Sequence, residues 1–376
     1  MKTLNVGVLG TGFMGKTHIF AYKTIPLYYD NLNFKINLYA VCSKHIENAK
    51  KAKDLFGFYY ATDSIYDIIN DENVDIIDIC TPNIYHKEAV IAALKAGKNV
   101  YCDKPLCTSY EGAKEILDAE SKTDTINQIT FQNRFFPATL LAKKMIDEGK
   151  IGKILTFDAK FLHSGSVDKE KPIGWKQDEK ISGGGVLFDL GSHILDLLYY
   201  LTGEFKSVYA KTQILYGKRP QKDGTLIDIT AEDSAFLMLE SKNGALGNVM
   251  ISKAATGEND ALSFAIYGDR GAIKFNLMEP NWLYFFDNTK SEGDFGGERG
   301  FTKIECVQRY SYPGGMFPSS KSSIGWIRGH VHCMYNFLDS VSAHKKASPS
   351  FKEGAYIQYV MEKCYESARE NKQIMF

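Results

Sequence analysis

Four ionisable side chains recur at helical spacing along one mostly apolar stretch of the chain, "GGGVLFDLGSHILDLLYYL", residues 183–201. They lie at positions i, i+4, i+7 and i+11, which share one face of an α-helix, and they are Asp189, His193, Asp196 and Tyr200. The remaining residues are mostly leucine and isoleucine at a helical period, which is typical of a buried helix. An imidazole four residues from a carboxylate suggests acid–base chemistry.

Three interpretations of this polar stripe remain open. It faces water, or its His and Asp satisfy each other inside a core, or it lines a pocket. A solvated face normally carries Lys, Glu and Arg, and residues 186–203 contain none of them. Short polar groups on such a helix favour the pocket. A metal is not expected, because no third ligand is spaced to complete an Asp-x-x-x-His pair.

A lysine in "YCDKPLC", residues 101–107, is the second candidate for chemistry. Lys104 follows an apolar run and precedes a proline, which places it at the carboxyl end of a predicted strand. Open α/β sheets bind their ligands at that edge. A single loop lysine is otherwise most often a solvated side chain.

A glycine turn near the N-terminus carries the third group of candidates. "GTGFMG" fits G-x-G-x-x-G and sits between a predicted strand, 4–10, and a helix that begins near Met14. Such a turn lets the backbone approach a pyrophosphate at the start of a helix. The predicted cofactor-binding residues of the turn are Gly10, Thr11, Gly12, Phe13, Met14 and Gly15. His18 is expected to be a packed helix residue.

The end of the second predicted strand bears on which dinucleotide binds. An acidic residue there would bind the adenosine 2′-hydroxyl of NAD, but this chain has Ser43, Lys44 and His45. A hydroxyl followed by a cation suits a 2′-phosphate. The sequence therefore predicts NAD(P) with a preference for NADP, although a serine also tolerates NAD.

The secondary-structure elements that position these residues follow two different patterns along the chain. Apolar runs at 4–10, 36–43, 74–81, 98–105 and 126–133 alternate with helical segments. This alternation predicts an α/β fold, a Rossmann domain over residues 1–132. Strands then follow one another at 153–162, 206–217, 233–241, 245–252, 261–267 and 271–275. They predict an α+β domain over 133–376 with a large, mostly antiparallel open sheet, closed by an amphipathic helix.

Composition narrows the class of protein. The chain has 376 residues, with 45 basic and 45 acidic side chains, so it offers no electrostatic case for nucleic acid or an anionic membrane. No apolar run spans a bilayer, and the N-terminus does not resemble a signal peptide. Its 7 cysteines are scattered without the spacing of a zinc site or a disulfide framework. We expect a soluble cytoplasmic protein.

Five motifs, in this order along nearly the whole chain, resemble those of the Gfo/Idh/MocA family of dehydrogenases. They are "GTGFMG", "CTPNIYH" (80–86), "CDKP" (102–105), "FQNRFFP" (131–137) and "GGGVLFDLGSHILD" (183–196). The resemblance implies that Lys104, Asp189 and His193 are the catalytic residues. Asp103 departs from the family, in which glutamate is commoner, so the charge is kept on a shorter side chain.

The same resemblance implies further cofactor-binding residues outside the glycine turn and the second strand. They are Thr81, Pro82, Asn83, His86, Asp103, Lys104 and Gln132, with Trp175 and Lys176 on a loop that closes over the cofactor. His193 would take the hydroxyl proton of the substrate, Asp189 would orient it, and Lys104 would contact the substrate oxygen. The polar stripe would then be one wall of a cleft between the two domains.

The expected function is an oxidoreductase that transfers a hydride between nicotinamide and a sugar, polyol or inositol-like cyclitol. Two alternatives remain: a glycosidase of the same family that acts by transient oxidation, and a catalytically silent cofactor-binding regulator. Relatives assemble through the open sheet, so a homo-oligomer, a dimer or tetramer, is expected. His163, Asp168, Trp175 and Tyr310 could line the substrate pocket, but each is more readily a structural or surface residue. The particular substrate and the physiological direction of the reaction stay open.

Overall fold

The computed structural model describes residues 1–376, which form two compact units. Unit 1 comprises Met1–Gln132, Tyr310–Ser319 and Ile327–Gln358, and unit 2 comprises Asn133–Arg309, Ser320–Trp326 and Tyr359–Phe376. This division differs from the expected second domain of 133–376, because two C-terminal segments pack with the N-terminal residues.

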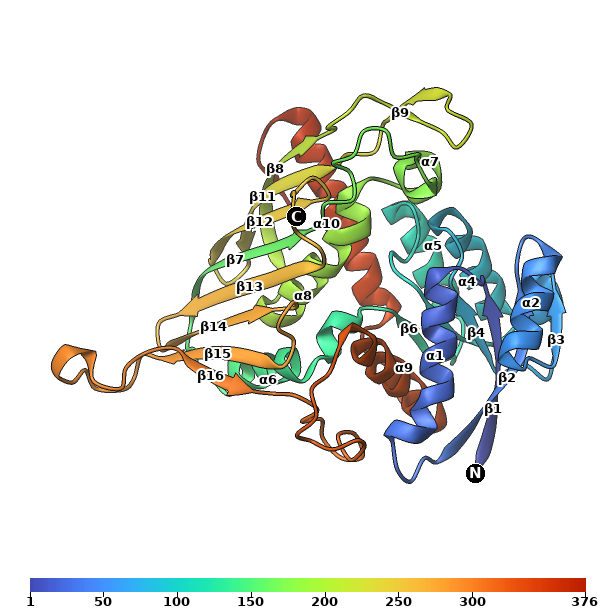
Figure 1. Ribbon diagram of the computed structural model, residues 1–376, viewed down its shortest axis with the longest axis horizontal. Coiled ribbons are helices and arrows are strands. Elements are labelled where there is room, and N and C mark those ends of the chain that lie inside the picture. The colour runs from blue at the N-terminus through green and yellow to red at the C-terminus, as the bar shows by residue number, and fades with distance from the viewer. The chain divides into compact units, whose positions relative to one another are not determined.

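Unit 1 is built on a six-stranded parallel sheet in the order β3-β2-β1-β4-β5-β6 (Figure 1). The strands are β1 (Lys2–Leu9), β2 (Phe34–Cys42), β3 (Tyr60–Thr62), β4 (Ile76–Ile79), β5 (Asn99–Cys102) and β6 (Asn127–Ile129). The central strands are buried on both faces, as parallel strands between helices must be. Their carboxyl ends lie at one edge of the sheet, where the glycine turn and the "CTPN" and "CDKP" segments begin.

Helices connect the strands of unit 1 and cover the sheet. They are α1 (Phe13–Tyr28), α2 (Ile46–Phe56), α3 (Ile65–Ile69), α4 (His86–Lys95) and α5 (Tyr110–Glu120). A 3₁₀ turn, η1 (Asn83–Tyr85), precedes α4.

One late helix, α9 (Trp326–Ser342), explains why a C-terminal segment belongs to unit 1. The Tyr101 hydroxyl of β5 donates to Cys333 Sγ at 3.2 Å, and Gln128 Nε2 of β6 donates to the Cys333 carbonyl at 2.9 Å. Asn336 Nδ2 donates to Gln128 Oε1 at 2.8 Å. The helix therefore completes the hydrogen bonding of buried sheet residues, which local sequence patterns cannot reveal.

Unit 2 is built on a nine-stranded mixed sheet in the order β16-β15-β14-β13-β7-β12-β11-β8-β17 (Figure 1). The strands are β7 (Ile154–Leu162), β8 (Phe205–Gln213), β11 (Ser234–Ser241), β12 (Leu246–Ser252), β13 (Ala261–Gly268), β14 (Gly271–Asn276), β15 (Trp282–Asp287), β16 (Thr302–Glu305) and β17 (Ile374–Met375). β7 pairs parallel with β12, and the other pairs are antiparallel. A separate hairpin joins β9 (Lys218–Pro220) to β10 (Leu226–Asp228). The prediction of a Rossmann domain plus a large, mostly antiparallel sheet is confirmed.

Helices cover one face of the unit 2 sheet. They are α6 (Pro137–Asp147) and α8 (Ser192–Thr202), joined by the C-terminal part of α10 (Phe351–Glu370). The short helix α7 (Glu179–Ser182) lies beside the 3₁₀ turn Trp175–Gln177 instead. A π-helical turn, Leu187–Gly191, and three short 3₁₀ turns, Gln132–Phe135, Trp175–Gln177 and Asp294–Gly296, complete the elements. The opposite face of the sheet stays open and exposes apolar side chains, among them Phe236, Met238 and Leu246.

The stretch Glu179–Thr202 is long and apolar enough to cross a membrane by composition. However, 83% of its apolar window is buried inside the structure. Leu197 and Leu198 of α8 are fully buried. This stretch is therefore a core helix, which passes the same compositional test.

Candidate active site

The glycine turn after β1 has the geometry of a dinucleotide cradle. Gly10 has a φ of 105°, and a Cβ there would lie 2.7 Å from the Cys80 carbonyl oxygen. A Cβ on Gly15 would lie 2.1 Å from the Gly10 carbonyl, whereas a Cβ on Gly12 would meet nothing within 4 Å. Gly12 is the N-cap residue of α1, so no side chain caps the first amides of this helix. Open space in front of the amides at a helix N-terminus fits a pyrophosphate.

Three predicted cofactor-binding residues share an unusual property. They are Thr81, Asp103 and Gln132, which follow the adjacent strands β4, β5 and β6. Thr81 Oγ1, Asp103 Oδ1 and Gln132 Oε1 are each buried without a hydrogen-bond partner. Buried polar atoms are almost always paired in a folded protein, so three such atoms at one sheet edge indicate a place for a polar ligand. The residues of unit 1 therefore fit a nicotinamide dinucleotide.

His86 lies at the same edge but is fully buried. Its Nε2 is 2.8 Å from the Thr81 carbonyl oxygen and its Nδ1 is 2.9 Å from the Pro105 carbonyl oxygen. Burial lowers the pKa of this imidazole, while Asp103 and the two carbonyls oppose that shift. The ring thus braces the segments before and after Lys104 rather than presenting a nitrogen to a ligand.

Lys104 is half-buried beside a histidine that the sequence analysis missed. His330, on α9, is 2% exposed, and burial lowers its pKa well below the usual range, with His18 and Lys104 adding to the shift. Nothing in the local sequence around His330 signals this neighbourhood, because α9 lies more than two hundred residues downstream. Pro82 directly precedes the η1 turn. Asn83 is the first residue of that turn and is buried.

The predicted 2′-phosphate residues lie where expected along the sheet edge. Ser43 directly follows β2 and is half-exposed, while Lys44 and His45 are exposed. The Ser43 amide donates to the Thr62 carbonyl at 3.3 Å, which fixes the backbone beside β3. Of the residues in the glycine turn, Phe13 is exposed, and Thr11 and Met14 are half-exposed.

His18, Asp78 and Cys80 form a buried cluster whose atoms could ligate a metal ion. His18 Nδ1 lies 2.9 Å from Asp78 Oδ1 and 3.1 Å from Cys80 Sγ. Ligand atoms of a tetrahedral zinc ion stand about 3.3 Å or more apart, given metal–ligand bonds of ~2.0–2.3 Å. Although burial opposes it, Asp78 raises the pKa of His18. We interpret the cluster as a hydrogen-bonded brace between α1 and β4, in which His18 is packed as expected.

In unit 2 the polar stripe begins at the π-helical turn that precedes α8. Asp189 lies within that turn and His193 lies in the first turn of α8, with 8% of His193 exposed. The His193 ring stands edge-on to Phe161 of β7, with ring centroids 6.1 Å apart. π-helical turns inside helices often occur at functional sites.

Two lysines flank the Asp189 carboxylate. Lys176 Nζ lies 2.6 Å from Oδ1, and Lys253 Nζ lies 2.8 Å from Oδ2. The predicted residue Lys176 thus reaches the predicted catalytic carboxylate, while Trp175 beside it is exposed. Lys253 was missed by the sequence analysis. The only signal is its position directly after the buried end of β12, which many structural lysines share.

The second half of the stripe has a structural role. Asp196 is 1% exposed and forms a buried ion pair with Arg134, whose Nε donates to Asp196 Oδ2 at 2.8 Å. The guanidinium also lies 4.8 Å from the Tyr200 ring centroid. Asp196 is therefore a buried residue whose partner is Arg134 rather than the histidine of the stripe, and the expectation that the whole stripe lines a pocket is wrong for this residue.

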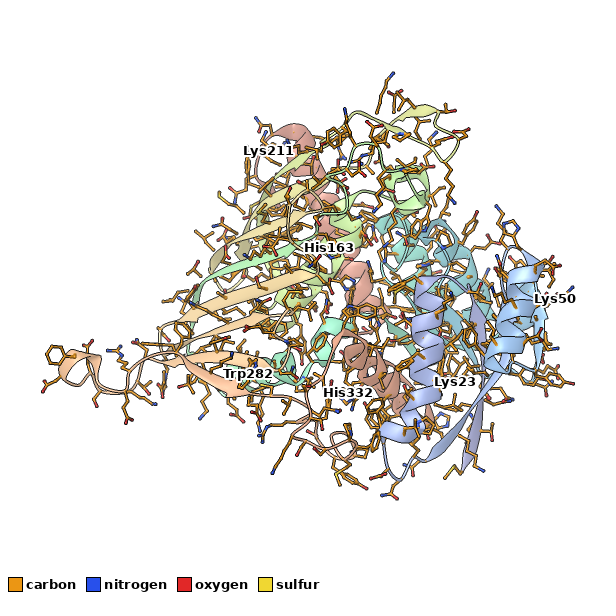
Figure 2. The ribbon with its side chains drawn as sticks, in the orientation of Figure 1. Lys23, Lys50, His163, Lys211, Trp282 and His332 are labelled. Atoms are coloured by element: carbon orange, nitrogen blue, oxygen red, sulfur yellow. The ribbon has the colours of Figure 1, made fainter.

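Three of the four possible pocket residues, those other than Trp175, differ in their surroundings. His163, labelled in Figure 2, directly follows β7. Its Nε2 is 3.1 Å from Asp260 Oδ1. Asp168 is exposed and accepts the Glu170 amide within a turn. Tyr310 is buried in unit 1, with its ring centroid 4.3 Å from the Arg328 guanidinium. Tyr310 is thus a packed residue.

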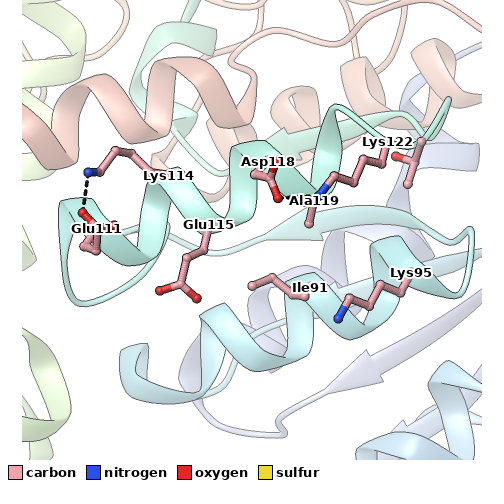
Figure 3. A pocket seen from close by; sticks show the side chains of 9 residues that line it. Ile91, Lys95, Glu111, Lys114, Glu115, Asp118, Ala119 and Lys122 are labelled. Carbon is pink, nitrogen blue, oxygen red and sulfur yellow. Dashed lines mark hydrogen bonds and ion pairs between the residues drawn. The ribbon is translucent and has the colours of Figure 1, made fainter.

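A surface groove between α4 and α5 does not contain any predicted site residue (Figure 3). Two lysines of the groove form ion pairs with carboxylates of α5, Lys114 with Glu111 and Lys122 with Asp118. Such exposed pairs are ordinary surface features.

Taken together, a dinucleotide cradle in one unit and a carboxylate–histidine helix in the other define an NAD(P)-dependent dehydrogenase acting on CH–OH groups. Comparison with known proteins agrees with this class. The chain belongs to the Gfo/Idh/MocA family of oxidoreductases. Residues 4–131 match the family model for the NAD-binding Rossmann fold, and residues 139–274 match the model for the Gfo/Idh/MocA C-terminal domain.

The relatives include named sugar and cyclitol dehydrogenases. Levoglucosan dehydrogenase of Pseudarthrobacter phenanthrenivorans is 32% identical over 381 residues, covering 98% of this chain and 97% of that protein. Myo-inositol 2-dehydrogenase of Thermotoga maritima is 28% identical, covering 78% of this chain and 80% of that protein. A solved structure of levoglucosan dehydrogenase with NADH and levoglucosan matches with a TM-score of 0.95 and 32% identity, covering 100% of this chain and 99% of the other.

Proposed function

We propose that the protein oxidises a secondary alcohol of a sugar, polyol or cyclitol, or reduces the corresponding ketone, with a nicotinamide dinucleotide. The observation that carries the proposal is the row of unpaired buried atoms on Thr81, Asp103 and Gln132 at the ligand-binding edge of the unit 1 sheet. The names of the relatives support the substrate class, because levoglucosan and inositols are polyhydroxylated rings.

The dinucleotide, when bound, supplies the hydride acceptor or donor at nicotinamide C4. The unit 1 residues hold it: the glycine turn and the N-terminus of α1 receive the pyrophosphate, and Thr81, Asp103 and Gln132 bind its polar groups. His86 fixes the backbone around Lys104. We propose that Trp175 and Lys176 close over the cofactor.

In the alcohol-oxidising direction, His193 takes the hydroxyl proton of the substrate. A neutral imidazole can accept a proton near pH 7, and its partial burial limits competing exchange with water. Asp189 stabilises the imidazolium that forms, and the ion pairs with Lys176 and Lys253 hold that carboxylate in place. Lys104 contacts the reacting oxygen.

The finer choice of cofactor rests on Ser43 and Lys44. A half-exposed hydroxyl followed by an exposed ammonium group suits a 2′-phosphate, so we propose a preference for NADP. Levoglucosan dehydrogenase, in contrast, has been solved with NADH. Measured affinities of this protein for NADP and NAD test the proposed preference.

We further propose a cytoplasmic homo-oligomer. The open face of the unit 2 sheet exposes apolar side chains on adjacent strands: Leu155, Phe236, Met238, Leu246 and Met250. A contiguous apolar surface of this kind is what an interface between two copies requires. All 7 cysteines are free, which suits a reducing compartment.

One experiment tests the function directly. The purified protein is incubated with NAD or NADP and a panel of inositols, anhydrosugars, glucosides and sugar phosphates, and absorbance at 340 nm is followed. We expect a rise with at least one neutral polyol, and its loss in Lys104→Ala and Asp189→Asn with dinucleotide binding retained. Release of an aglycone without any net change at 340 nm would contradict the proposal and favour the glycosidase.

A further inference from the structure

A buried glutamate contacts the segment from which the catalytic helix begins. Glu232 lies two residues before β11 and is 7% exposed. The Gly185 amide donates to its Oε2 at 2.9 Å, and the Leu187 amide donates to its Oε1 at 2.8 Å. The Val186 amide donates to the Glu232 carbonyl at 2.9 Å. One residue thus accepts hydrogen bonds from three consecutive amides, 185–187.

Tyr365, from the unit 2 part of α10, completes this arrangement. Its hydroxyl donates to Glu232 Oε1 at 2.8 Å and accepts the Gly185 amide at 3.2 Å. Tyr365 and Glu232 approach the backbone of residues 184 and 185 so closely that both of these residues must be glycine. A Cβ on Gly184 would lie 2.3 Å from the Tyr365 hydroxyl oxygen, and a Cβ on Gly185 would lie 2.2 Å from the Glu232 carbonyl oxygen.

The clamped amides are directly upstream of Asp189. The π-helical turn begins at Leu187, and the Asp189 amide donates to the Gly185 carbonyl at 3.1 Å. A carboxylate at this point also balances the positive end of the helix that carries Asp189 and His193. Burial raises the pKa of Glu232, opposed by the bonds from Leu187, Tyr365 and Gly185. These bonds offset the cost of enclosing the carboxylate.

We propose that Glu232 is a positioning residue for the reaction: with Tyr365 and the amides of 185–187 it forms a clamp that fixes the orientation of Asp189 and His193. The effect of the clamp on catalysis rests on the proposed function, whereas the existence of the clamp does not depend on that function. Glutamine at position 232 keeps the shape yet places an N–H₂ group against one of the amides. Such a mismatch should loosen the turn without emptying the core.

The clamp is tested first by hydrogen exchange on the full-length protein. We expect Glu232→Gln to speed exchange on the order of 10-fold in peptides covering 183–195, relative to the wild type. Tyr365→Phe should give a smaller change in the same peptides. Glu240→Gln, near the end of β11 and paired with Lys206 at the surface, is the matched control and should change nothing there. Unchanged exchange of 183–195 in both variants would overturn the clamp.

The positioning role is tested by steady-state kinetics with the best substrate of the polyol panel. We expect Glu232→Gln to lower kcat about 10- to 100-fold, because small misplacements of catalytic groups have effects of this size. Dinucleotide affinity, measured by fluorescence titration, should stay within about twofold, and the acid limb of the kcat profile should move. If Glu232→Gln only reduced the amount of folded protein, kcat would fall by the same factor at every pH and the acid limb would not move. That result would contradict a positioning role for Glu232.

Two further outcomes are decisive. If Glu232→Gln does not fold, Tyr365→Phe decides: lower kcat with faster exchange at 183–195 supports the clamp, and wild-type values in both overturn it. If the wild type oxidises no polyol, the proposed function fails, while the exchange experiment still supports or overturns the clamp.

Discussion

His193 is the residue on which the proposed proton transfer depends most. Replacing it with alanine should lower kcat about 10²- to 10⁴-fold, which is what a positioned general base usually contributes. Dinucleotide affinity should barely change, because the cradle belongs to unit 1. Stopped-flow kinetics across a range of pH measure both kcat and the acid limb of its pH profile, that is, the range in which kcat falls as the pH falls. If the variant kept both, another group would take the proton, and Lys104 would be the next candidate.

Ser43 decides the second residue-scale prediction. A carboxylate introduced by Ser43→Asp would repel a 2′-phosphate and could instead bind a 2′-hydroxyl. The ratio of NADP to NAD affinity should therefore fall by at least about tenfold in fluorescence titrations. Asp63→Asn, at an exposed position after β3, serves as a neighbouring control. An unchanged ratio in Ser43→Asp would show that the 2′ position is recognised elsewhere.

Lys253 carries the third prediction. Its ammonium group is the less exposed partner of Asp189, with 14% of the side chain exposed against 46% for Lys176. Lys253→Met should lower kcat on the order of 10-fold, since a bond between charged groups contributes about 1.5–3 kcal/mol. Lys253→Arg should recover part of the rate. The exposed Lys222→Met should keep wild-type kinetics, and equal effects of both methionine variants would contradict the assigned role.

At the scale of elements, α9 makes the stability of unit 1 sensitive to acid. The half-buried His332 has its Nδ1 2.6 Å from the Tyr29 hydroxyl, and desolvation, with the nearby Arg328, lowers its pKa to about 3. The unfolded chain binds a proton at this residue near pH 6.5, while the folded chain does not. Stability is therefore present above that pH and is lost as pH falls towards 3.

The lowered pKa of His332 sets the expected size of this loss of stability. Between pH 6.5 and 5, His332 alone should reduce the free energy of unfolding by about 2 kcal/mol, at ~1.4 kcal/mol per pH unit. Urea titrations of the wild type and His332→Gln at both pH values measure it, and the variant should lose less. His45→Gln, an exposed site, is the control. A variant with undiminished acid sensitivity would refute the assignment.

Comparison of elements also shows which features the sequence could predict. Alternating apolar runs predicted the parallel strands, because each strand is buried on both faces and reads as a continuous apolar segment. The pairing of Asp196 with Arg134 was not predictable, since the partners lie 62 positions apart. The three glycines at 183–185 signalled a turn, but not that Glu232 and Tyr365 require them. Such long-range contacts leave no local periodicity.

At the scale of the whole molecule, unit 1 is discontinuous. Residues 1–132 contain the complete parallel sheet, yet α9 supplies Cys333 and Asn336 to buried atoms of β5 and β6. We expect a fragment of 1–132 to have a broad, weak thermal transition and exposed apolar surface by dye binding. A fusion of 1–132 to 310–358 through a flexible linker should restore a cooperative transition. A sharply cooperative melt of the short fragment would contradict this.

The central place of β7 has a consequence for how the chain is made. β7 pairs with β12 and β13, whose partner residues begin at Leu246 and Ala261, some ninety to a hundred residues later in synthesis. Both edges of this strand therefore lack their backbone partners until most of unit 2 has left the ribosome. Sheet formation is governed by contacts distant in sequence, which predicts slow refolding and a need for protection from aggregation at that stage.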